Sequence, residues 1–431
     1  MTGCSPSMPW LTALYGPDSE EMARQSGRWA GLVEEYARSF GGGNVRLFSA
    51  PGRMEIGGNH TDHNHGKVLA AAVHLDTIAA AAATGDGRIT VRSRGYPEPF
   101  HMALDNLAPR PEERGTTVAL IRGIAARFRE LGFSVGGLNA CLDGGIPVGS
   151  GLSSSASVEV LLGQVFNCLY NEACVPGVQI AAIGQYAENA YFGKPCGLMD
   201  QIACALGGIV KIDFLDPRSP DVQNVFFDFG AHGYRILVVD TGGSHADLTE
   251  EYAAIPREMK QIAGHFGRAV CREITLKDVY DALPELRRRA GDRAVLRALH
   301  FLQENERVDL QVSALQKSDL DGFLRLVAES GNSSFRWLQN CQRPGSAAEQ
   351  GVALGLVLSE GFVRRSGGAC RVHGGGFAGT ILVFLPAEET AAFQSLMESV
   401  FGPGCLKDLR IRPQGTVEIA GTVPPPEHAS G

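Results

Sequence analysis

Apolar residues recur with helical periodicity along several stretches of this chain. The stretches are residues 18–40, 117–131, 153–170 and 178–191, and most of residues 250–330, which show Glu/Arg/Leu periodicity. Shorter apolar runs bounded by glycine or proline predict strands. The predicted strands cover residues 45–49, 138–142, 236–240 and 380–385.

The Ala- and Val-rich stretch 67–83 predicts a pair of buried strands, and the strand before it is expected to end at Ala50-Pro51-Gly52. Strands and helices are mixed in both halves without a regular βαβ alternation, which favours an α+β fold. A chain of 431 residues is too long for one compact core. We therefore expect two domains, residues 1–230 and 231–431, and a disordered tail over residues 424–431.

Composition and charge narrow the range of partners. The chain is 44% hydrophobic and carries a net charge of −8, with no extended run of Lys or Arg. This charge argues against nucleic acid and against an anionic membrane surface as partners. No apolar run approaches the length that spans a bilayer. The sequence does not determine the oligomeric state and is compatible with a monomer.

The ten cysteines are scattered, and several lie in apolar runs, as Cys204 does. None forms a Cys-x-x-Cys pair, so we expect buried free thiols rather than a disulfide framework. No signal peptide is evident at the N-terminus. Together these features predict a reducing, cytoplasmic location.

A polar segment separates the first strand from the apolar stretch after it. The segment reads Ala50-Pro51-Gly52-Arg53-Met54-Glu55-Ile56-Gly57-Gly58-Asn59-His60-Thr61-Asp62-His63-Asn64. Carboxylate and imidazole groups match the donor and acceptor roles of sugar hydroxyls. On composition alone, a sugar site and a surface turn with incidental charges are equal alternatives for this segment. A zinc site at His60, His63 and His65 is disfavoured, because the spacing is not standard and no Cys or further His cluster completes it.

A glycine- and serine-rich loop opens the helix expected over residues 153–170. The loop reads Gly144-Gly145-Ile146-Pro147-Val148-Gly149-Ser150-Gly151-Leu152-Ser153-Ser154-Ser155-Ala156. Glycines let backbone N–H groups approach a ligand, and the helix N-terminus adds unpaired donors, so this loop predicts a phosphate site. Its serine hydroxyls could also bind Mg²⁺. The Gly-Lys-Ser/Thr of a Walker loop is missing, and a flexible linker is disfavoured because a well-patterned helix follows.

Two further elements are weaker by themselves. Glu188 lies on a predicted helix, twelve residues before Asp200. One of these carboxylates could hold Mg²⁺ while the other accepts a proton, although a lone Asp after Met is more often a helix cap. A plain hairpin turn or a tight loop against phosphates could form just before the last predicted strand, where the chain reads Arg371-Val372-His373-Gly374-Gly375-Gly376-Phe377-Ala378-Gly379-Thr380.

Taken together and in this order, the motifs resemble those of the galactokinase family within the GHMP kinases. The segment from Gly52 resembles a signature in which Gly-Arg opens a stretch that ends in Gly-Glu-His-Thr-Asp-Tyr-Asn. Residues 149–157 resemble the phosphate loop, and residues 196–201 resemble the segment around a catalytic Asp. Residues 371–380 resemble the C-terminal glycine motif.

The resemblance implies a two-domain kinase that uses ATP and Mg²⁺ to phosphorylate the anomeric hydroxyl of galactose, with its active site between the domains. Asp200 would be the catalytic base, and Arg53 would stabilise charge and lower the effective pKa of Asp200 or of the attacking hydroxyl. Ser155 and Glu188 would hold Mg²⁺. The triphosphate would be wrapped by Gly149, Ser150, Gly151, Leu152, Ser153, Ser154 and Ser155. The residues expected to contact the sugar are Asn59, His60, Thr61, Asp62, Gly197 and Tyr252.

Departures from the family pattern bear on the sugar. The family's sugar-binding Glu corresponds here to Asn59, and the Tyr next in that motif corresponds to His63. The segments after Tyr252 and over residues 331–341 also depart from the pattern. Asn59, expected near the C6 end of the sugar, motivates an alternative function as an anomeric kinase for another hexose or a uronic acid. A non-catalytic sensor of sugar and ATP is disfavoured, because the residues implied for catalysis and metal binding are all present.

Overall fold

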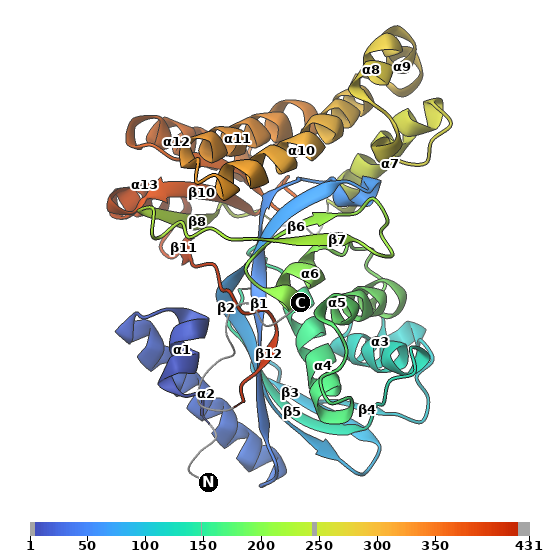
Figure 1. Cartoon of the computed structure of the whole chain (residues 1–431), viewed down its shortest axis with the longest axis vertical. Helices are drawn as coiled ribbons and strands as arrows, with labels where there is room; N and C mark the ends of the chain where they lie inside the picture. Colours follow the sequence, from blue (N-terminus) through green and yellow to red (C-terminus); the bar gives the residue numbers. More distant parts are fainter. Residues whose placement is uncertain (1–4, 148, 244–247, 421–431) are drawn as a thin grey trace.

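The computed structural model describes residues 5–147, 149–243 and 248–420. Its strands form two sheets: the first extends from the lower part of Figure 1 upward, and the second lies beside its upper end, on the left. Helices cover both sheets, so the α+β architecture predicted from the sequence is confirmed. Within these described ranges, no helix is long and apolar enough to cross a membrane.

The first sheet has eight strands and is antiparallel except where β3 runs parallel to β5. Its main path runs β12-β1-β2-β5-β3-β4, and β6 joins β2 to β7. The strands are β1 (Arg46–Gly57), β2 (Lys67–Thr84), β3 (Arg88–Ser93), β4 (Phe100–Ala103), β5 (Gly137–Gly144), β6 (Ile209–Asp213), β7 (Asp221–Val225) and β12 (Val417–Glu418).

Strand β1 is longer than the sequence predicts. The prediction that it ends at Ala50-Pro51-Gly52 is wrong, because the register with β2 shifts between Pro51 and Gly52 and the strand continues to Gly57. Such a shift accommodates a proline that cannot donate to the ladder. Likewise, residues 67–83 belong to one continuous strand instead of the predicted pair. The extension of β1 includes Arg53 and Glu55, and the backbone N–H of Glu55 donates to His373 in the second half of the chain.

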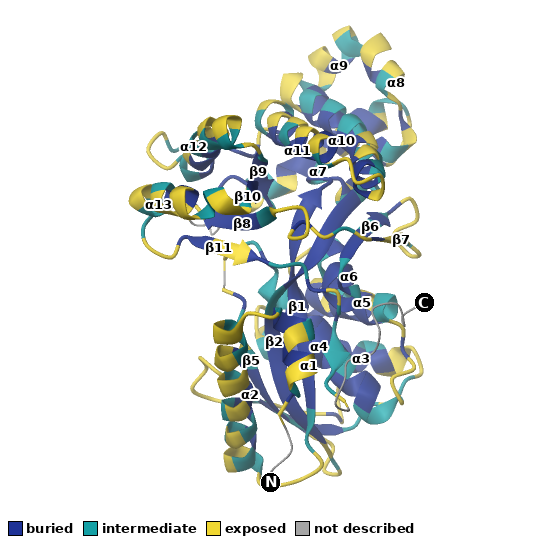
Figure 2. Cartoon of the chain, turned by 60° about the vertical axis from the view of Figure 1, so that its left-hand side comes forward, coloured by how far each residue is buried: buried dark blue, intermediate teal, exposed yellow. Residues whose placement is uncertain are grey.

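Both faces of the first sheet are covered. On β2, Ile78 and Ala80 join the core under the N-terminal helices, whereas Ala79 and Ala81 join the core under the helices of the other face. Figure 2 shows the outer faces of the N-terminal helices exposed and the strands beneath them buried. The helices are α1 (Met8–Tyr15) and α2 (Ser19–Phe40) on one face, and α3 (Thr117–Glu130), α4 (Ser154–Tyr170), α5 (Gly177–Tyr186) and α6 (Met199–Leu206) on the other.

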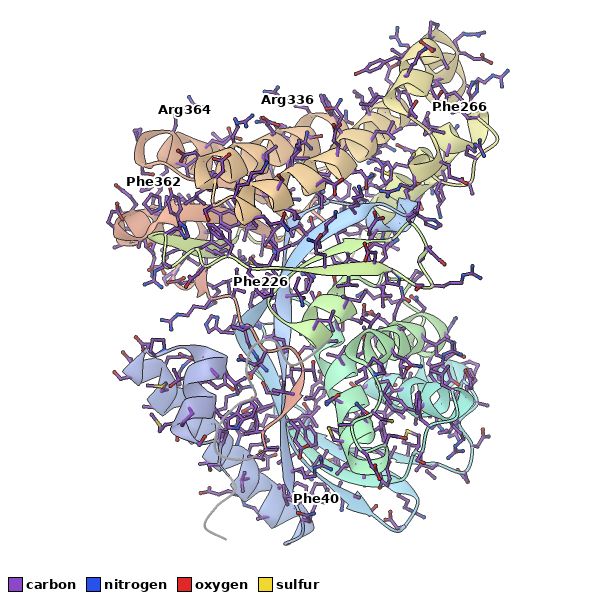
Figure 3. The ribbon with its side chains drawn as sticks, in the orientation of Figure 1. Phe40, Phe226, Phe266, Arg336, Phe362 and Arg364 are labelled. Atoms are coloured by element: carbon purple, nitrogen blue, oxygen red, sulfur yellow. The ribbon has the colours of Figure 1, made fainter. Side chains whose placement is uncertain are left out.

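The second sheet is antiparallel and has the order β11-β8-β10-β9. Its strands are β8 (Tyr234–Asp240), β9 (Ala369–His373), β10 (Thr380–Pro386) and β11 (Leu406–Leu409). Leu237 and Val383 face the core that α12 and α13 cover, and Ile236 and Phe384 face a core shared with α10 and α11. Arg364, on α12, lies exposed on the outer side of this layer (Figure 3). The helices of this half are α7 (Thr249–His265), α8 (Leu276–Asp281), α9 (Leu283–Ala290), α10 (Asp292–Gln316), α11 (Leu320–Ser333), α12 (Gly351–Ser366) and α13 (Thr390–Phe401).

Short helical turns connect these elements. Four are 3₁₀ turns, namely η1 (Asp62–Asn64), η2 (Pro111–Glu113), η4 (Cys271–Glu273) and η6 (Ala387–Glu389). Two are π-helical, namely η3 (Ala187–Phe192) and η5 (Ser334–Leu338). The single helix predicted over residues 178–191 is therefore α5 followed by η3, and wider turns of this kind often mark functional sites.

The end of the chain returns to the first sheet. After β11 in the second sheet, the chain runs to β12, where Glu418 lies opposite Phe48 of β1. On the way, the N–H of Gly208 donates to the carbonyl of Arg412 at 2.8 Å. The division into residues 1–230 and 231–431 stays a prediction, and this returning strand crosses it. The predicted tail over residues 424–431 lies outside the described residues.

A buried ion cluster fastens the N-terminal helices and the returning segment to the first sheet. Its centre is Asp76, a fully buried residue of β2. The Asp76 carboxylate accepts hydrogen bonds from Tyr15 (2.8 Å), Arg28 (2.6 Å), Ser49 (2.5 Å) and Arg412 (3.3 Å). Burial by itself would raise the pKa of Asp76, but the charges of Arg28 and Arg412 hold it below its ordinary value.

Replacing Asp76 by Asn should lower the free energy of unfolding by about 3–5 kcal/mol at neutral pH, because buried guanidinium groups lose their counter-charge. Urea denaturation measures this change. The folded pKa of Asp76 is depressed, so its stabilisation is present above the unfolded pKa and is lost as the pH falls through the folded pKa. Asp281→Asn, at an exposed ion pair on α8, is the control and should change stability by less than about 0.5 kcal/mol. Equal midpoints for the two variants would contradict the role of Asp76.

Candidate active site

Segments far apart in the sequence meet at the end of β1. They are the end of β1 itself, the loop before α4, the start of α6 and β9 with the glycine-rich loop after it. Arg53 joins three of them, because its guanidinium donates to the carbonyl of Gly151 and binds Asp200. The backbone N–H of Glu55 donates to Nε2 of His373 at 3.2 Å, which brings in the fourth.

Asp200 lies in the first turn of α6 and forms a two-point ion pair with Arg53. The Nε–Oδ1 and Nη2–Oδ2 distances are both 2.7 Å, and the Ser153 hydroxyl also donates to Oδ2. Burial would raise the pKa of Asp200, but the charge and hydrogen bonds of Arg53, together with Ser153, hold it below its usual value. The carboxylate is therefore ionised at neutral pH and faces a fixed positive charge.

The loop before α4 has the backbone shape of a phosphate cradle. Gly149, Gly151 and Ser153 have φ angles of 80°, 71° and 58°, in the left-handed region. At Gly151 a side chain would also crowd the ring of His373, so only glycine fits. Helix α4 begins at Ser154, so its unpaired N–H groups open toward the loop.

The side chains of Ser150 and Leu152 stabilise this loop from within the protein. The hydroxyl of Ser150 donates to the carbonyl of Pro147 at 2.6 Å. The side chain of Leu152 is fully buried in the core, while its carbonyl accepts the backbone N–H of Arg53 at 3.0 Å. Any phosphate contact from Ser150 or Leu152 would therefore come from the backbone.

Ser155 and Glu188 lie close enough to share a cation. The distance between Oγ of Ser155 and Oε1 of Glu188 is 3.4 Å, and Glu188 lies on the π-helical turn η3. Hydroxyl and carboxylate oxygens are donors that suit Mg²⁺, so this pair fits the ion. No cluster of three or more His, Cys, Asp or Glu that could hold a metal occurs in the described part of the chain. Phosphate oxygens and water would have to complete the coordination.

Most of the residues expected at the sugar form a cluster of their own. Nε2 of His60 lies 2.9 Å from the carbonyl oxygen of Gly375, and the His60 ring stacks at 6.5 Å on Tyr252. Burial lowers the pKa of His60 to about 4, so its ring is neutral and Nε2 donates. Gly197 lies directly against the Asp62 carboxylate, where any side chain would collide with it. The structure thus brings His60, Asp62, Gly197 and Tyr252 to one place.

Sequence comparisons agree with this geometry. Residues 34–83 match the galactokinase galactose-binding signature, and residues 119–208 match the GHMP kinases N terminal domain. The chain is 32% identical over 386 residues to a galactokinase from Streptomyces coelicolor, across 89% of this chain and 95% of that protein. The chain belongs to the galactokinase family. It is therefore a phosphotransferase of the sugar kinase class, with ATP as the co-substrate that this kinase family implies.

Solved structures of galactokinase and of other GHMP kinases share the fold. A galactokinase from Lactococcus lactis, complexed with galactose, aligns with a TM-score of 0.77 at 24% identity, over 90% of this chain and 99% of that one. A mevalonate kinase from Methanococcus jannaschii aligns with a TM-score of 0.61 at 15% identity, over 86% and 99%. These likenesses confirm the GHMP kinase fold predicted from the sequence.

The side chain of Asn59, which was expected to contact the sugar, has all its hydrogen-bonding groups occupied within the protein. Its side chain is fully buried, and its amide makes four hydrogen bonds within the protein. Nδ2 donates to Glu55 (2.9 Å) and to the carbonyl of Gly374 (2.8 Å), while Oδ1 accepts from Ser334 (3.2 Å) and Asn340 (2.8 Å). The amide is saturated, so the expected sugar contact through Asn59 is corrected to a structural role.

Thr61 needs the same correction. Its side chain is fully buried, and the hydroxyl lies 2.8 Å from the carbonyl of Gly58 and 2.6 Å from that of Lys67. It therefore holds the turn between β1 and β2 instead of contacting the sugar. His63, the second departure from the family motif, is half-exposed, and its Nε2 lies 3.7 Å from the Asp62 carboxylate.

Sequence reasoning missed three groups beside the metal pair. Nζ of Lys194 lies 3.1 Å from Glu188, and Nε2 of Gln201 bridges Glu188 (3.1 Å) and Glu159 (2.9 Å). Burial, reinforced by the charge of Glu188, raises the pKa of Glu159 well above its usual value. A lone carboxylate in the otherwise apolar run of α4 is the signal that could have found Glu159.

A surface groove elsewhere contains none of these residues. It lies between the end of β7 and the strands β8 and β11, and its lining includes Phe226, Phe229, Arg235 and Arg410. Figure 3 shows Phe226 near the junction of the two sheets. The groove is therefore separate from the polar site at the end of β1.

Asn59→Glu should destabilise the protein by about 2–4 kcal/mol, because it removes two buried donors and places a carboxylate against Glu55 and a carbonyl oxygen. Urea denaturation measures the loss. Asn332→Glu, at an exposed position on α11, is the matched control and should stay near the wild-type midpoint. A stable Asn59→Glu protein with altered sugar preference would instead support a direct sugar contact.

Proposed function

We propose that the protein is an ATP-dependent galactose kinase that converts ATP and D-galactose to ADP and α-D-galactose 1-phosphate. The observation that carries this proposal is the Arg53–Asp200 ion pair, which lies against the glycine-rich loop through contacts with Gly151 and Ser153. A carboxylate beside a phosphate-binding loop can take a proton from a sugar hydroxyl that attacks the bound phosphate. The family match to a galactokinase at 32% identity supports galactose as the sugar.

In the proposed reaction, the anomeric oxygen of the sugar attacks the γ-phosphorus, and the bond from that phosphorus to the oxygen that leaves with ADP breaks. Asp200 receives the proton of the hydroxyl as its oxygen becomes bonded to phosphorus. The pKa of Asp200 is depressed, so it is a weak base. We therefore assign much of the rate enhancement to alignment of the reactants and to the Arg53 charge beside the reacting oxygens.

The remaining groups bind and orient the substrates. Backbone N–H groups of residues 149–155 and the N-terminus of α4 would hold the phosphates. Mg²⁺, which the sequence implies, would lie at Ser155 and Glu188 and offset phosphate charge when bound. His60, Asp62, Gly197 and Tyr252 would surround the sugar.

The cysteines suit a reducing, cytoplasmic location. All cysteines among the described residues are free, and most are buried. A disulfide-poor protein of this kind is typical of compartments that keep thiols reduced.

Incubation with ATP and a panel of hexoses and hexuronic acids tests the function, with the phosphorylated carbon identified by ³¹P and ¹³C NMR. We expect galactose 1-phosphate as the main product. A uronic acid 1-phosphate as the main product would support the alternative raised by Asn59. Binding of sugar and ATP without turnover would overturn the assignment as an enzyme.

Asp200→Asn should lower kcat by about 10² or more, because the amide keeps the shape of the side chain but does not accept the proton. Calorimetry should show nearly unchanged ATP binding, which separates lost chemistry from lost structure. Asp216→Asn, in an exposed loop, serves as the control with wild-type kcat. Near wild-type kcat in Asp200→Asn would disprove the base assignment.

Ser155→Ala and Glu188→Gln should each raise the Mg²⁺ concentration needed for the half-maximal rate, because each removes one of two protein oxygens from the ion. Rates measured against Mg²⁺ concentration give this value directly. Ser219→Ala, at an exposed turn, is the control for Ser155→Ala. An unchanged Mg²⁺ curve for Glu188→Gln would remove that residue from the metal site.

A further inference from the structure

Glu55 is a buried carboxylate that the proposed mechanism does not use. It lies two residues after Arg53 on β1, so both side chains leave the same face of the strand. The intervening Met54 and the following Ile56 point to the other face, where both are fully buried in the hydrophobic core. The strand therefore directs the Glu55 carboxylate to the polar layer that also contains Asp200.

One oxygen of Glu55 is held by the protein, and the other is not. Oε1 accepts hydrogen bonds from Nη2 of Arg371 (2.8 Å) and Nδ2 of Asn59 (2.9 Å). Oε2 receives no hydrogen bond from any described residue, and the side chain keeps 5% of its surface exposed. Oε2 therefore keeps a small accessible surface, through which a ligand or a water can donate a hydrogen bond to this nearly buried carboxylate.

The surroundings of Glu55 connect it to the proposed sugar side. Among the charges acting on it, Asp62 is unfavourable, while Arg371 and Arg53 are favourable. Its hydrogen-bond partner Asn59 directly precedes His60, and the His60 ring is hydrogen-bonded to the carbonyl of Gly375. Glu55 is thus connected to the cluster that contains His60 and Asp62.

We propose that Glu55 is a specificity-determining residue for the sugar: Oε2 accepts a hydrogen bond from one sugar hydroxyl while Arg371 and Asn59 hold Oε1. This inference rests on the proposed function as a sugar kinase. Asn59 is then a positioning residue, because its amide orients the Glu55 carboxylate without contacting the sugar. The negative charge that the sequence lacks at residue 59 is present four residues earlier, in contact with that same residue.

This placement has a consequence for the substrate class. A sugar carboxylate placed at this subsite would meet the charges of both Glu55 and Asp62, whereas a hydroxyl would donate to them. The site should therefore select a neutral hexose and reject a uronic acid. That outcome reverses the tolerance for uronic acids suggested by Asn59 alone.

Calorimetric binding of galactose and of the four monodeoxygalactoses that lack the hydroxyl at C2, C3, C4 or C6 tests the proposal in wild type and in Glu55→Gln. In the wild type, loss of the recognised hydroxyl should weaken binding about ten- to hundredfold. In Glu55→Gln, removing that same hydroxyl should weaken binding by less than about threefold. The weakening caused by removing the hydroxyls at the other carbons should be unchanged. Glu113→Gln, at a partly buried Glu–Arg pair distant from the site, is the control and should keep the wild-type pattern.

Each outcome decides the question. An equal loss of affinity for galactose and all four analogues in Glu55→Gln would show a structural role and overturn the proposal. Absence of galactose binding in the wild type would overturn it together with galactose as the substrate. Binding with the expected pattern but without phosphorylation would overturn the kinase function and leave the Glu55 proposal standing.

A second measurement covers the case in which Glu55→Gln does not fold. Burial, only partly offset by Arg371 and Arg53, raises the pKa of Glu55 to about 7, with Asp62 adding to the rise. The wild-type penalty for the missing hydroxyl should therefore grow as the pH rises from about 5.5 to about 8.5. His373, which faces the backbone of Glu55, has its pKa lowered by burial to about 3 and stays neutral over this range.

The same pH series on His63→Gln removes the imidazole that lies 3.7 Å from the Asp62 carboxylate. A penalty that still grows with pH in this variant supports ionisation of Glu55 as the cause. A penalty that does not change with pH in either protein would overturn the proposal.

Discussion

The ion pair between Arg53 and Asp200 is the contact on which the arrangement of the site depends. It joins the extended end of β1 to the first turn of α6, and the same guanidinium binds the carbonyl of Gly151 in the loop before α4. All three segments therefore take their relative positions from one planar side chain. Because the Arg53 side chain is only 8% exposed, a residue at position 200 that could not accept its hydrogen bonds would leave this guanidinium unpaired, which is more costly than losing an exposed pair.

A second constraint connects the two halves of the molecule. The Asn59 amide uses both donors and both acceptors, and its backbone carbonyl oxygen lies 3.0 Å from Nε2 of His300 on α10. Its partners Ser334, Asn340 and Gly374 all belong to the second half of the chain. An amide offers two donors and a carbonyl acceptor on one short side chain, which a hydroxyl or a carboxylate does not, so this junction depends on the residue type and not merely on polarity.

The site also brings several carboxylates close together, and their different environments give them different pKa values. Asp200 is kept ionised by Arg53, whereas burial raises the pKa of Glu55 to about 7 and raises that of Glu159 well above its usual value. Carboxylates with such different pKa values suit different roles, because one remains charged at neutral pH and another can carry a proton. The positive charges of Arg371 and Arg53 offset part of the cost of burying the Glu55 carboxylate among these acidic groups.

The sequence by itself determined the helices over residues 18–40, 117–131 and 153–170, the glycine-rich loop and the order of the motifs, because each depends on regularities within a few neighbouring residues. It did not determine that β1 continues past Pro51, since that depends on the register with β2. Nor did it determine the role of Asn59, whose partners Ser334 and Asn340 lie 275 and 281 residues away. Local patterns show which side chains are polar. Only the tertiary structure decides which of their hydrogen-bonding atoms are already occupied, as in Asn59, and which remain open to a ligand, as in Glu55.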